Sequence, residues 1–264
     1  MRTNFNYPLV KLFDSPRARC GFVAAMLTAI TLTTQAESID IASSNDRVTL
    51  VELYTSEGCS SCPPADRWLS TLKDDAGLWR DFVPVAFHVD YWDYIGWPDR
   101  FASATYTARQ RQNGARNKMR TVYTPGFFVD GSEWRGWFRN PTLRSHDTGA
   151  AGLLTLNIES SMITARFTPP KDTKDGLILN IALLGSDLVT AVKAGENRDR
   201  QLRHDFAVLG YRHVVMHQED GGYTVDTELP KNQIEGTDGA RLAIAAWVSR
   251  KSDDVPVQAA GGWL

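Results

Sequence analysis

The stretch that decides the fold runs from residue 51 to residue 66 and reads VELYTSEGCSSCPPAD. Residues 47–54, which overlap its beginning, are mostly β-branched or apolar and predict a buried strand. Pro63 and Pro64 fit the first positions of a helix, and apolar residues at 68, 69 and 72 follow with helical spacing. Cys59 and Cys62 therefore lie in a turn between a strand and a helix.

A second apolar run at residues 82–89 follows this helix and predicts a second buried strand. The order strand, helix, strand favours a parallel pair joined by a right-handed crossover. Residues 90–120 are polar and rich in aromatic side chains, and we expect a helix around residues 101–113. Residues 121–131 then indicate a turn, a strand and a hairpin corner.

A different pattern begins near Gly152. Short runs of alternating apolar and polar residues recur from there to the C-terminus, separated by Gly, Pro, Asp and Asn. This spacing is typical of an all-β sandwich, here of about 110 residues. We therefore expect a domain boundary near residue 150.

The N-terminus has the features of a secretory signal peptide. Basic residues precede the apolar run 21–32, and small residues lead to a cleavage site after Ala36. The run has about a dozen residues, whereas a membrane-spanning helix needs roughly 20. We expect residues 1–36 to be removed and residues 37–46 to form a polar lead-in. The protein is then periplasmic or secreted, with no stable membrane insertion after cleavage.

The composition excludes several classes of protein. The chain has 264 residues with 42% hydrophobic and 23% charged residues, the profile of a folded rather than a disordered protein. Its net charge is −2 and Lys and Arg form no basic stripe, so we expect no nucleic-acid partner. Three cysteines are too few for a disulfide-built scaffold, and cleavage would remove Cys20. Cys59 and Cys62 then remain as a pair in a compartment where disulfides persist.

The turn that holds Cys59 and Cys62 carries the chemistry. A helix N-terminus has a partial positive charge, which stabilises a thiolate and lowers the pKa of the thiol. We expect Cys59 to be exposed and to act as the nucleophile, and Cys62 to be shielded and to resolve the mixed disulfide. The prolines after Cys62 disfavour helical geometry there, so the helix is expected to start near Pro64, which dilutes the effect. The alternative is an inert surface disulfide, although a loop this small constrains little chain entropy.

Two further positions are candidates for the same chemistry. Glu52 lies seven residues before Cys59 in an otherwise apolar strand. As a buried carboxylate it would take the proton of Cys62 during exchange, and at a strand edge it would face solvent; the sequence leaves both open. At Thr124–Pro125, a cis proline would leave the backbone of Thr124 free to pair with an extended substrate.

The sequence offers little for a metal ion, and we expect no cofactor. Structural zinc needs four ligands, and no second Cys-x-x-Cys motif exists. Copper(I) accepts soft thiolates at low coordination and stays open, with His88 as a third ligand. Residues 196–205 are dense in charge. They form either a solvated loop or a surface that binds a partner or locks two domains through ion pairs.

Several segments together resemble one known family. They are residues 51–66, His88–Asp93, Arg109–Arg111, Val122–Pro125 and Glu196–Arg198. The chain is similar in them, and from about residue 47 to its end, to the secreted thioredoxin-like family known as domain of unknown function 1223. The resemblance implies that Cys59 and Cys62 occupy the redox position and Pro125 the cis-proline position, with Glu52 near the buried acid. It also implies that residues 90–120 are an inserted helical cap.

These observations predict an α/β thioredoxin-like domain over residues 47–150 with a helical insertion at 90–120. A mostly β, sandwich-like domain over residues 151–264 follows. The predicted function is that of a periplasmic or secreted thiol–disulfide oxidoreductase that acts on protein thiols and disulfides with the help of a redox partner protein. The alternatives are a non-catalytic binding module with a structural disulfide and a copper(I)-handling protein.

Overall fold

The computed structural model of the chain describes residues 1–3, 8, 38–139, 143, 149–171 and 175–264. The chain divides into a short unit Met1–Gln35 and a compact unit Ala36–Leu264, and the fold below is that of the second unit. The predicted signal peptide lies almost entirely outside the described residues. Within the described part, no helix is both long enough and apolar enough to span a membrane.

Strands dominate the described residues, which include two α-helices, α1 (Pro63–Thr71) and α2 (Ala104–Arg116). Three short 3₁₀-helices accompany them: η1 (Leu72–Asp74), η2 (Asp93–Ile95) and η3 (Gly136–Phe138). The strands of the first half are β1 (Ser38–Ala42), β2 (Thr49–Thr55), β3 (Phe82–His88), β4 (Gly126–Val129) and β5 (Ser132–Glu133). Those of the second half are β6 (Leu153–Glu159), β7 (Met162–Thr168), β8 (Leu177–Ser186), β9 (Leu188–Ala191), β10 (Gln201–His204), β11 (Ala207–Val215), β12 (His217–Glu219), β13 (Gly222–Glu228), β14 (Arg241–Arg250) and β15 (Pro256–Trp263).

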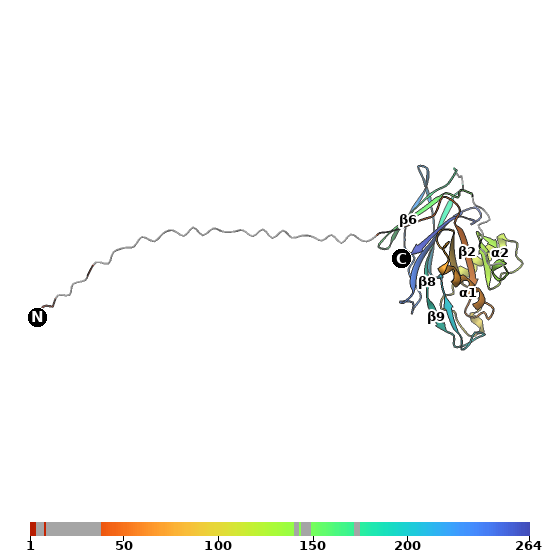
Figure 1. Cartoon of the computed structure of the whole chain (residues 1–264), viewed down its shortest axis with the longest axis horizontal. Coiled ribbons are helices and arrows are strands. Elements are labelled where there is room, and N and C mark those ends of the chain that lie inside the picture. Colours follow the sequence, from red (N-terminus) through yellow and green to blue (C-terminus); the bar gives the residue numbers. More distant parts are fainter. Residues whose placement is uncertain (4–7, 9–37, 140–142, 144–148, 172–174) are drawn as a thin grey trace. The chain divides into compact units, whose positions relative to one another are not determined.

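An eight-stranded sheet of order β15-β14-β8-β11-β3-β2-β4-β5 forms the centre of the protein. Strands β2 and β3 are parallel, with Thr49 opposite Phe82 and Thr55 opposite His88, and α1 connects them. On the far side of β3, β11 also runs parallel and pairs at Ala86. In Figure 1, β2 accordingly lies between α2 and the later strand β8.

A second sheet, of order β1-β6-β7-β13-β12, packs against the β8 and β14 end of the first. Alternation along β14 separates two cores, because successive side chains of a strand point to opposite faces. Ile244 and Val248 pack with the five-stranded sheet. Ala245 and Trp247 pack in the other core with β2 and β3. Most strands of the second half of the chain therefore belong to one of two sheets that pack against each other.

The predicted fold class, an α/β thioredoxin-like domain followed by a separate sandwich-like β domain, is wrong. Strands β11, β8, β14 and β15 of the second half continue the sheet that contains β2 and β3. The predicted boundary near residue 150 falls inside the compact unit Ala36–Leu264. The local strand, helix, strand pattern does not specify which strand takes the free edge of β3. A strand far along the chain takes that edge and merges the two expected parts.

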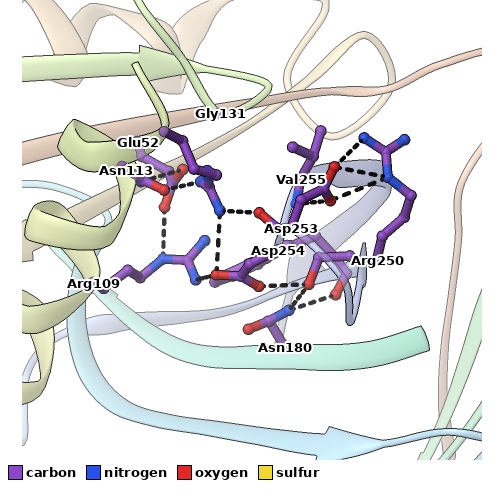
Figure 2. A network of polar contacts seen from close by, with 12 residues as sticks. Glu52, Arg109, Asn113, Gly131, Asn180, Arg250, Asp253, Asp254 and Val255 are labelled. Atoms are coloured by element: carbon purple, nitrogen blue, oxygen red, sulfur yellow. Dashed lines mark hydrogen bonds and ion pairs between the residues drawn. The ribbon is translucent and has the colours of Figure 1, made fainter. Parts of the chain in front are cut away.

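A buried ion pair fastens α2 to the sheet. The side chain of Glu52 is fully buried, and its Oε1 accepts hydrogen bonds from Arg109 Nε at 2.8 Å and from the Tyr54 hydroxyl at 3.1 Å. Asn113 Nδ2 donates to the other carboxylate oxygen at 3.4 Å. Arg109 also reaches Asp254, in the turn between β14 and β15, at 3.4 Å. Figure 2 shows how these side chains link α2, β2 and that turn.

The charge on Arg109 is retained in spite of its burial. Burial acts to lower the pKa of the guanidinium, but Glu52, Tyr211, Tyr54 and Asp254 together outweigh it and hold that pKa well above its ordinary value. The guanidinium also lies 4.9 Å from the ring centroid of Trp247. Arg109 therefore keeps its charge inside the core, where its guanidinium is paired with the side chain of Glu52.

Replacing Arg109 with methionine should destabilise the protein strongly, because it leaves the carboxylate of Glu52 buried without its cation. We expect the free energy of unfolding to fall by about 3–5 kcal/mol. Urea denaturation followed by tryptophan fluorescence measures this change.

The matched control is Arg80→Met, which removes an exposed ion pair to Asp81 at 2.7 Å. Exposed pairs contribute little to stability, so this variant should unfold close to the wild-type midpoint. Equal stability of the two variants would contradict the role given to the buried pair.

Candidate functional site

The disulfide predicted from the sequence is confirmed: Cys59 and Cys62 are bonded, with their Cα atoms 5.5 Å apart, in the loop between β2 and α1. The amide of Cys59 donates to the carbonyl of Ser56 at 3.1 Å, and that of Cys62 to the carbonyl of Cys59 at 3.2 Å. The helix begins at Pro63, one residue earlier than expected, because Cys62 itself has helical φ and ψ of −76° and −38°. Cys62 is the N-cap residue and lies at the positive end of α1.

Both cysteines are buried. Cys59 is 1% exposed and Cys62 is 0% exposed, so the expectation of an exposed Cys59 is wrong. The sulfur of Cys59 lies 3.3 Å from the hydroxyl oxygen of Ser61, a residue that is exposed. Of the two sulfurs, the one on Cys59 therefore has a solvent-facing hydroxyl as its neighbour.

Residues 92–97 pack closely against the disulfide loop. A Cβ atom added to Gly58 would lie 3.0 Å from the Cβ of Trp92 and 3.5 Å from the Cδ1 of Ile95. A Cβ atom added to Gly195 would lie 3.3 Å from the Cβ of Trp97. The segment is therefore held between two glycines from distant parts of the chain, and the absence of side chains there permits the close approach.

The turn between β9 and β10 is anchored to the same loop. Asn197, which is fully buried, donates from Nδ2 to the carbonyl of Glu57 at 2.8 Å and to that of Cys59 at 2.9 Å. The backbone amide of Ser60 donates to Glu196 Oε2 at 3.1 Å. Residues 196–205 were expected to form a solvated loop or a surface that binds a partner or locks two domains. Two of these residues, Glu196 and Asn197, instead hold the disulfide loop by hydrogen bonds.

A buried group of acid and base side chains adjoins the loop. His88 Nδ1 lies 2.6 Å from Asp99 Oδ2, and His204 Nε2 lies 3.1 Å from Glu57 Oε1. The same Asp99 oxygen accepts the backbone amide of Glu57 at 2.8 Å. The two imidazole rings are 4.9 Å apart between centroids. Asp66, buried in the first turns of α1, lies within electrostatic range of both histidines. These five residues are called the acid–base cluster below.

Charge pairing sets the protonation of the cluster. Burial acts to lower the pKa of His88, but Asp99 outweighs it and the pKa is raised. Burial alone would raise the pKa of Asp99 and of Glu57. The pKa of each is nevertheless lowered, that of Asp99 by His88 and that of Glu57 by the hydrogen bond from His204. Asp66 differs from both, because burial raises the pKa of its carboxyl group.

Sequence reasoning missed most of this cluster. It singled out His88 as a possible copper ligand, but not Asp66, Asp99 or His204. Thr55 and His88 end the parallel strands β2 and β3 in register, and polar groups collect at that edge of such sheets. An acidic residue four positions after the second cysteine, on the helix face that carries Cys62, was a further sign in the sequence.

Glu52, the predicted proton acceptor, lies in the ion pair with Arg109 (Figure 2). Of the two positions that the sequence left open for Glu52, the structure shows the buried one and not the solvent-facing strand edge. Its hydrogen-bond donors come from β2 and α2, not from the disulfide loop. This placement favours a structural role for Glu52.

The turn at Thr124–Pro125 has a cis peptide bond and lies near the loop through Trp92. Trp92 Nε1 donates to the hydroxyl of Thr124 at 2.7 Å, and the same Trp92 packs on Gly58. A pocket of about 410 Å³ opens beside the turn. Its lining consists of Tyr123, Pro125, Phe127, Trp134, Arg135, Trp137 and Phe138.

No group of three or more His, Cys, Asp or Glu side chains within the described ranges is arranged to hold a metal ion. Nδ1 of His88, the residue considered as a copper(I) ligand, is engaged by Asp99.

Residues 50–248 match the family model described as "Protein of unknown function (DUF1223)", and the chain belongs to this family. No curated protein matches the chain. Among solved structures, it is similar to protein AGR_C_4864 from Agrobacterium tumefaciens, with 23% identity and a TM-score of 0.56 over 83% of this chain and 95% of that one. It is also similar to HBP35 of Porphyromonas gingivalis, with 16% identity and a TM-score of 0.56 over 84% of this chain and 76% of that one. At these identities the likeness concerns the fold alone.

Replacing Asn197 with alanine should loosen the disulfide loop, because the carbonyls of Glu57 and Cys59 lose their shared donor. We expect dithiothreitol to reduce the disulfide several-fold faster, and the free energy of unfolding to fall by about 1–3 kcal/mol. Time-resolved trapping of free thiols measures the rate. Glu196→Gln, an exposed change that keeps an acceptor for Ser60, is the control and should reduce at the wild-type rate.

Replacing Asp66 with asparagine should stabilise the oxidised protein at neutral pH. A carboxyl whose pKa is raised by folding contributes stability at low pH and loses it as pH rises through the raised value. The advantage of Asp66→Asn should therefore grow from about pH 4 to pH 7, as measured by urea denaturation at each pH. A difference that does not vary with pH would contradict the raised pKa.

Proposed function

We propose that this protein is a thiol–disulfide oxidoreductase that exchanges the Cys59–Cys62 disulfide with cysteines of other proteins. The proposal rests on the contrast between the short loop that the disulfide closes and the two distant segments that contact this loop. The disulfide links residues three positions apart, so it constrains little of the unfolded chain. Yet residues 92–97 and the turn at Glu196–Asn197 both converge on its loop. A bridge kept for stability alone gives no reason for that convergence.

The roles of the two cysteines follow from their positions. In the reduced protein, the thiol of Cys59 would lie just before the positive end of α1, where a thiolate is stabilised. The Ser61 hydroxyl, 3.3 Å from the Cys59 sulfur, would donate to such a thiolate. Cys62, fully buried at the N-cap, is the resolving thiol. Because both cysteines are buried, the residues around the loop must move for a protein substrate to reach Cys59.

The turn at Thr124–Pro125 is the proposed substrate-binding element. An extended substrate chain that pairs with the backbone of Thr124 would lie beside the aromatic pocket next to Pro125. That pocket, of about 410 Å³, has room for an apolar or aromatic side chain beside Pro125. Aromatic linings of this kind hold apolar groups by burial and stacking.

The proposed compartment and partners rest on the signal peptide predicted from the sequence and on the disulfide. We propose a periplasmic or secreted protein, because disulfides persist outside the cytoplasm. Its substrates would be protein thiols or disulfides, and a redox partner protein would restore the pair after each reaction. Nucleic acid and stable membrane insertion are not part of the proposal.

The burial of both sulfurs favours a second candidate function. Cys59 is 1% exposed and Cys62 is 0% exposed, so a folded partner cannot reach the disulfide in this conformation. A non-catalytic binding module with a structural disulfide would have this geometry without any need for opening.

The reduction potential of the pair separates the two functions. We expect equilibration in glutathione buffers, with trapping of free thiols, to give a value between about −270 and −120 mV. Cys59→Ser should abolish exchange with a model protein disulfide. Cys62→Ser should accumulate a mixed disulfide on Cys59. A potential below about −300 mV, with no exchange by the wild-type protein, would favour the binding module.

A further inference from the structure

The acid–base cluster occupies the carboxyl-terminal edge of the parallel strands, next to the disulfide loop. Glu57 belongs to that loop, His88 ends β3, and His204 ends β10. All five members are buried, with Asp66 at 8% exposure and the rest at 5% or less. Five ionisable side chains rarely share an interior without a chemical reason, since each charge costs free energy to bury.

Asp66 stands apart in this cluster because the two ion pairs are formed by the other four members. His88 pairs with Asp99, and His204 pairs with Glu57. The remaining ring nitrogens, His88 Nε2 and His204 Nδ1, have no hydrogen-bond partner in the described part of the chain. Both histidines lie close enough to Asp66 to lower the pKa of its carboxyl electrostatically. The cluster thus combines a carboxyl outside the pairs with two buried nitrogens able to exchange a proton.

Asp66 is also the member best placed toward Cys62. Its amide donates to the Cys62 carbonyl at 3.1 Å, so the two residues are one helical turn apart. Side chains four positions apart lie on one face of a helix, and each leans toward the N-terminus. The carboxyl of Asp66 therefore leans from inside the protein toward the turn that carries Cys62.

We propose that Asp66 is the proton carrier for Cys62 in thiol–disulfide exchange, with His88 and His204 as the groups that exchange its proton onward. This inference rests on the proposed function. It moves the proton-transfer role from Glu52, which is engaged by Arg109, to the opposite end of the loop.

The proposed step balances in both directions. A substrate thiolate bonds to the sulfur of Cys59, the Cys59–Cys62 bond breaks, and its electron pair leaves on the Cys62 sulfur. The acid form of Asp66 gives that sulfur a proton. In reverse, the carboxylate of Asp66 takes the proton of the Cys62 thiol. The resulting thiolate attacks Cys59 and releases the substrate as a thiolate, so no other oxidant or reductant is needed.

The surroundings of Asp66 suit both halves of this step. Burial raises the pKa of its carboxyl, which keeps the acid form present at a higher pH than for an exposed aspartate. The histidines His204 and His88 oppose this shift, as does the hydroxyl of Thr55 from β2, while Asp99 adds to it. Glu57, the remaining charged member, is paired with His204. A pKa closer to the working pH is what a group needs to give and take a proton.

The test is the rate at which Cys62 resolves a glutathione mixed disulfide formed on Cys59, measured in single turnovers from pH 5 to 9. For Asp66→Asn we expect the rate to fall roughly 100-fold near neutral pH. It should then rise with pH only as the Cys62 thiol ionises unaided. Asp81→Asn, an exposed change of the same chemical kind outside the disulfide loop, is the matched control and should retain the wild-type pH profile.

The outcomes separate this inference from the proposed function. If the wild-type protein forms no mixed disulfide and resolves none, the proposed function fails and the inference fails with it. If the wild-type protein exchanges and Asp66→Asn has the same pH profile, the inference alone is overturned.

A second measurement avoids variants altogether. The titration of the Asp66 carboxyl, followed by carbon NMR in the wild-type protein, should move to a different pH when the disulfide is reduced, because Cys62 then titrates beside it. Identical titration in the two redox states would overturn the inference.

Discussion

The pairing of β3 with β2 on one side and β11 on the other is the constraint on which the rest of the structure depends. The amide of Ala86 donates to the carbonyl of Phe206 at 2.9 Å, and this contact places the end of β10 beside the end of β3. His204 consequently meets His88, and the turn after β9 reaches the disulfide loop. The candidate site is therefore assembled from both halves of the chain, and neither half contains it alone.

The site combines a disulfide with nearly complete burial. The loop is fixed at its backbone by Asn197, packed by Trp92 at Gly58, and lined by the acid–base cluster. Each contact restricts motion and removes water, which strengthens the electrostatic interactions between the buried groups. The same enclosure leaves Cys59 and Cys62 buried, so in the proposed function access to the disulfide requires an opening of the residues around it.

Local elements were predictable from the sequence, whereas their assembly was not. The apolar run before Cys59 and the prolines after Cys62 determine a strand and a helix by rules that act over a few residues. The place of β11 beside β3 depends on pairing between strands far apart in the chain, which no local pattern encodes. Glu52 illustrates the same limit: the sequence left its burial open, and its cation, Arg109, comes from a helix 57 positions away. The role of Asn197 is hidden for the same reason, since its partners lie at a separation of 138 and 140 residues.

The ends of the eight-stranded sheet bear on how the protein behaves at high concentration. A long, open edge strand offers unpaired N–H and C=O groups to which another chain adds a strand. At one end, β5 has two residues, Ser132 and Glu133, so few such groups are available. At the other end, β15 begins with Pro256, which has no N–H, and the ring of Trp79 lies against Gly261. A protein whose central sheet contains eight strands is thereby poorly suited to edge-to-edge polymerisation.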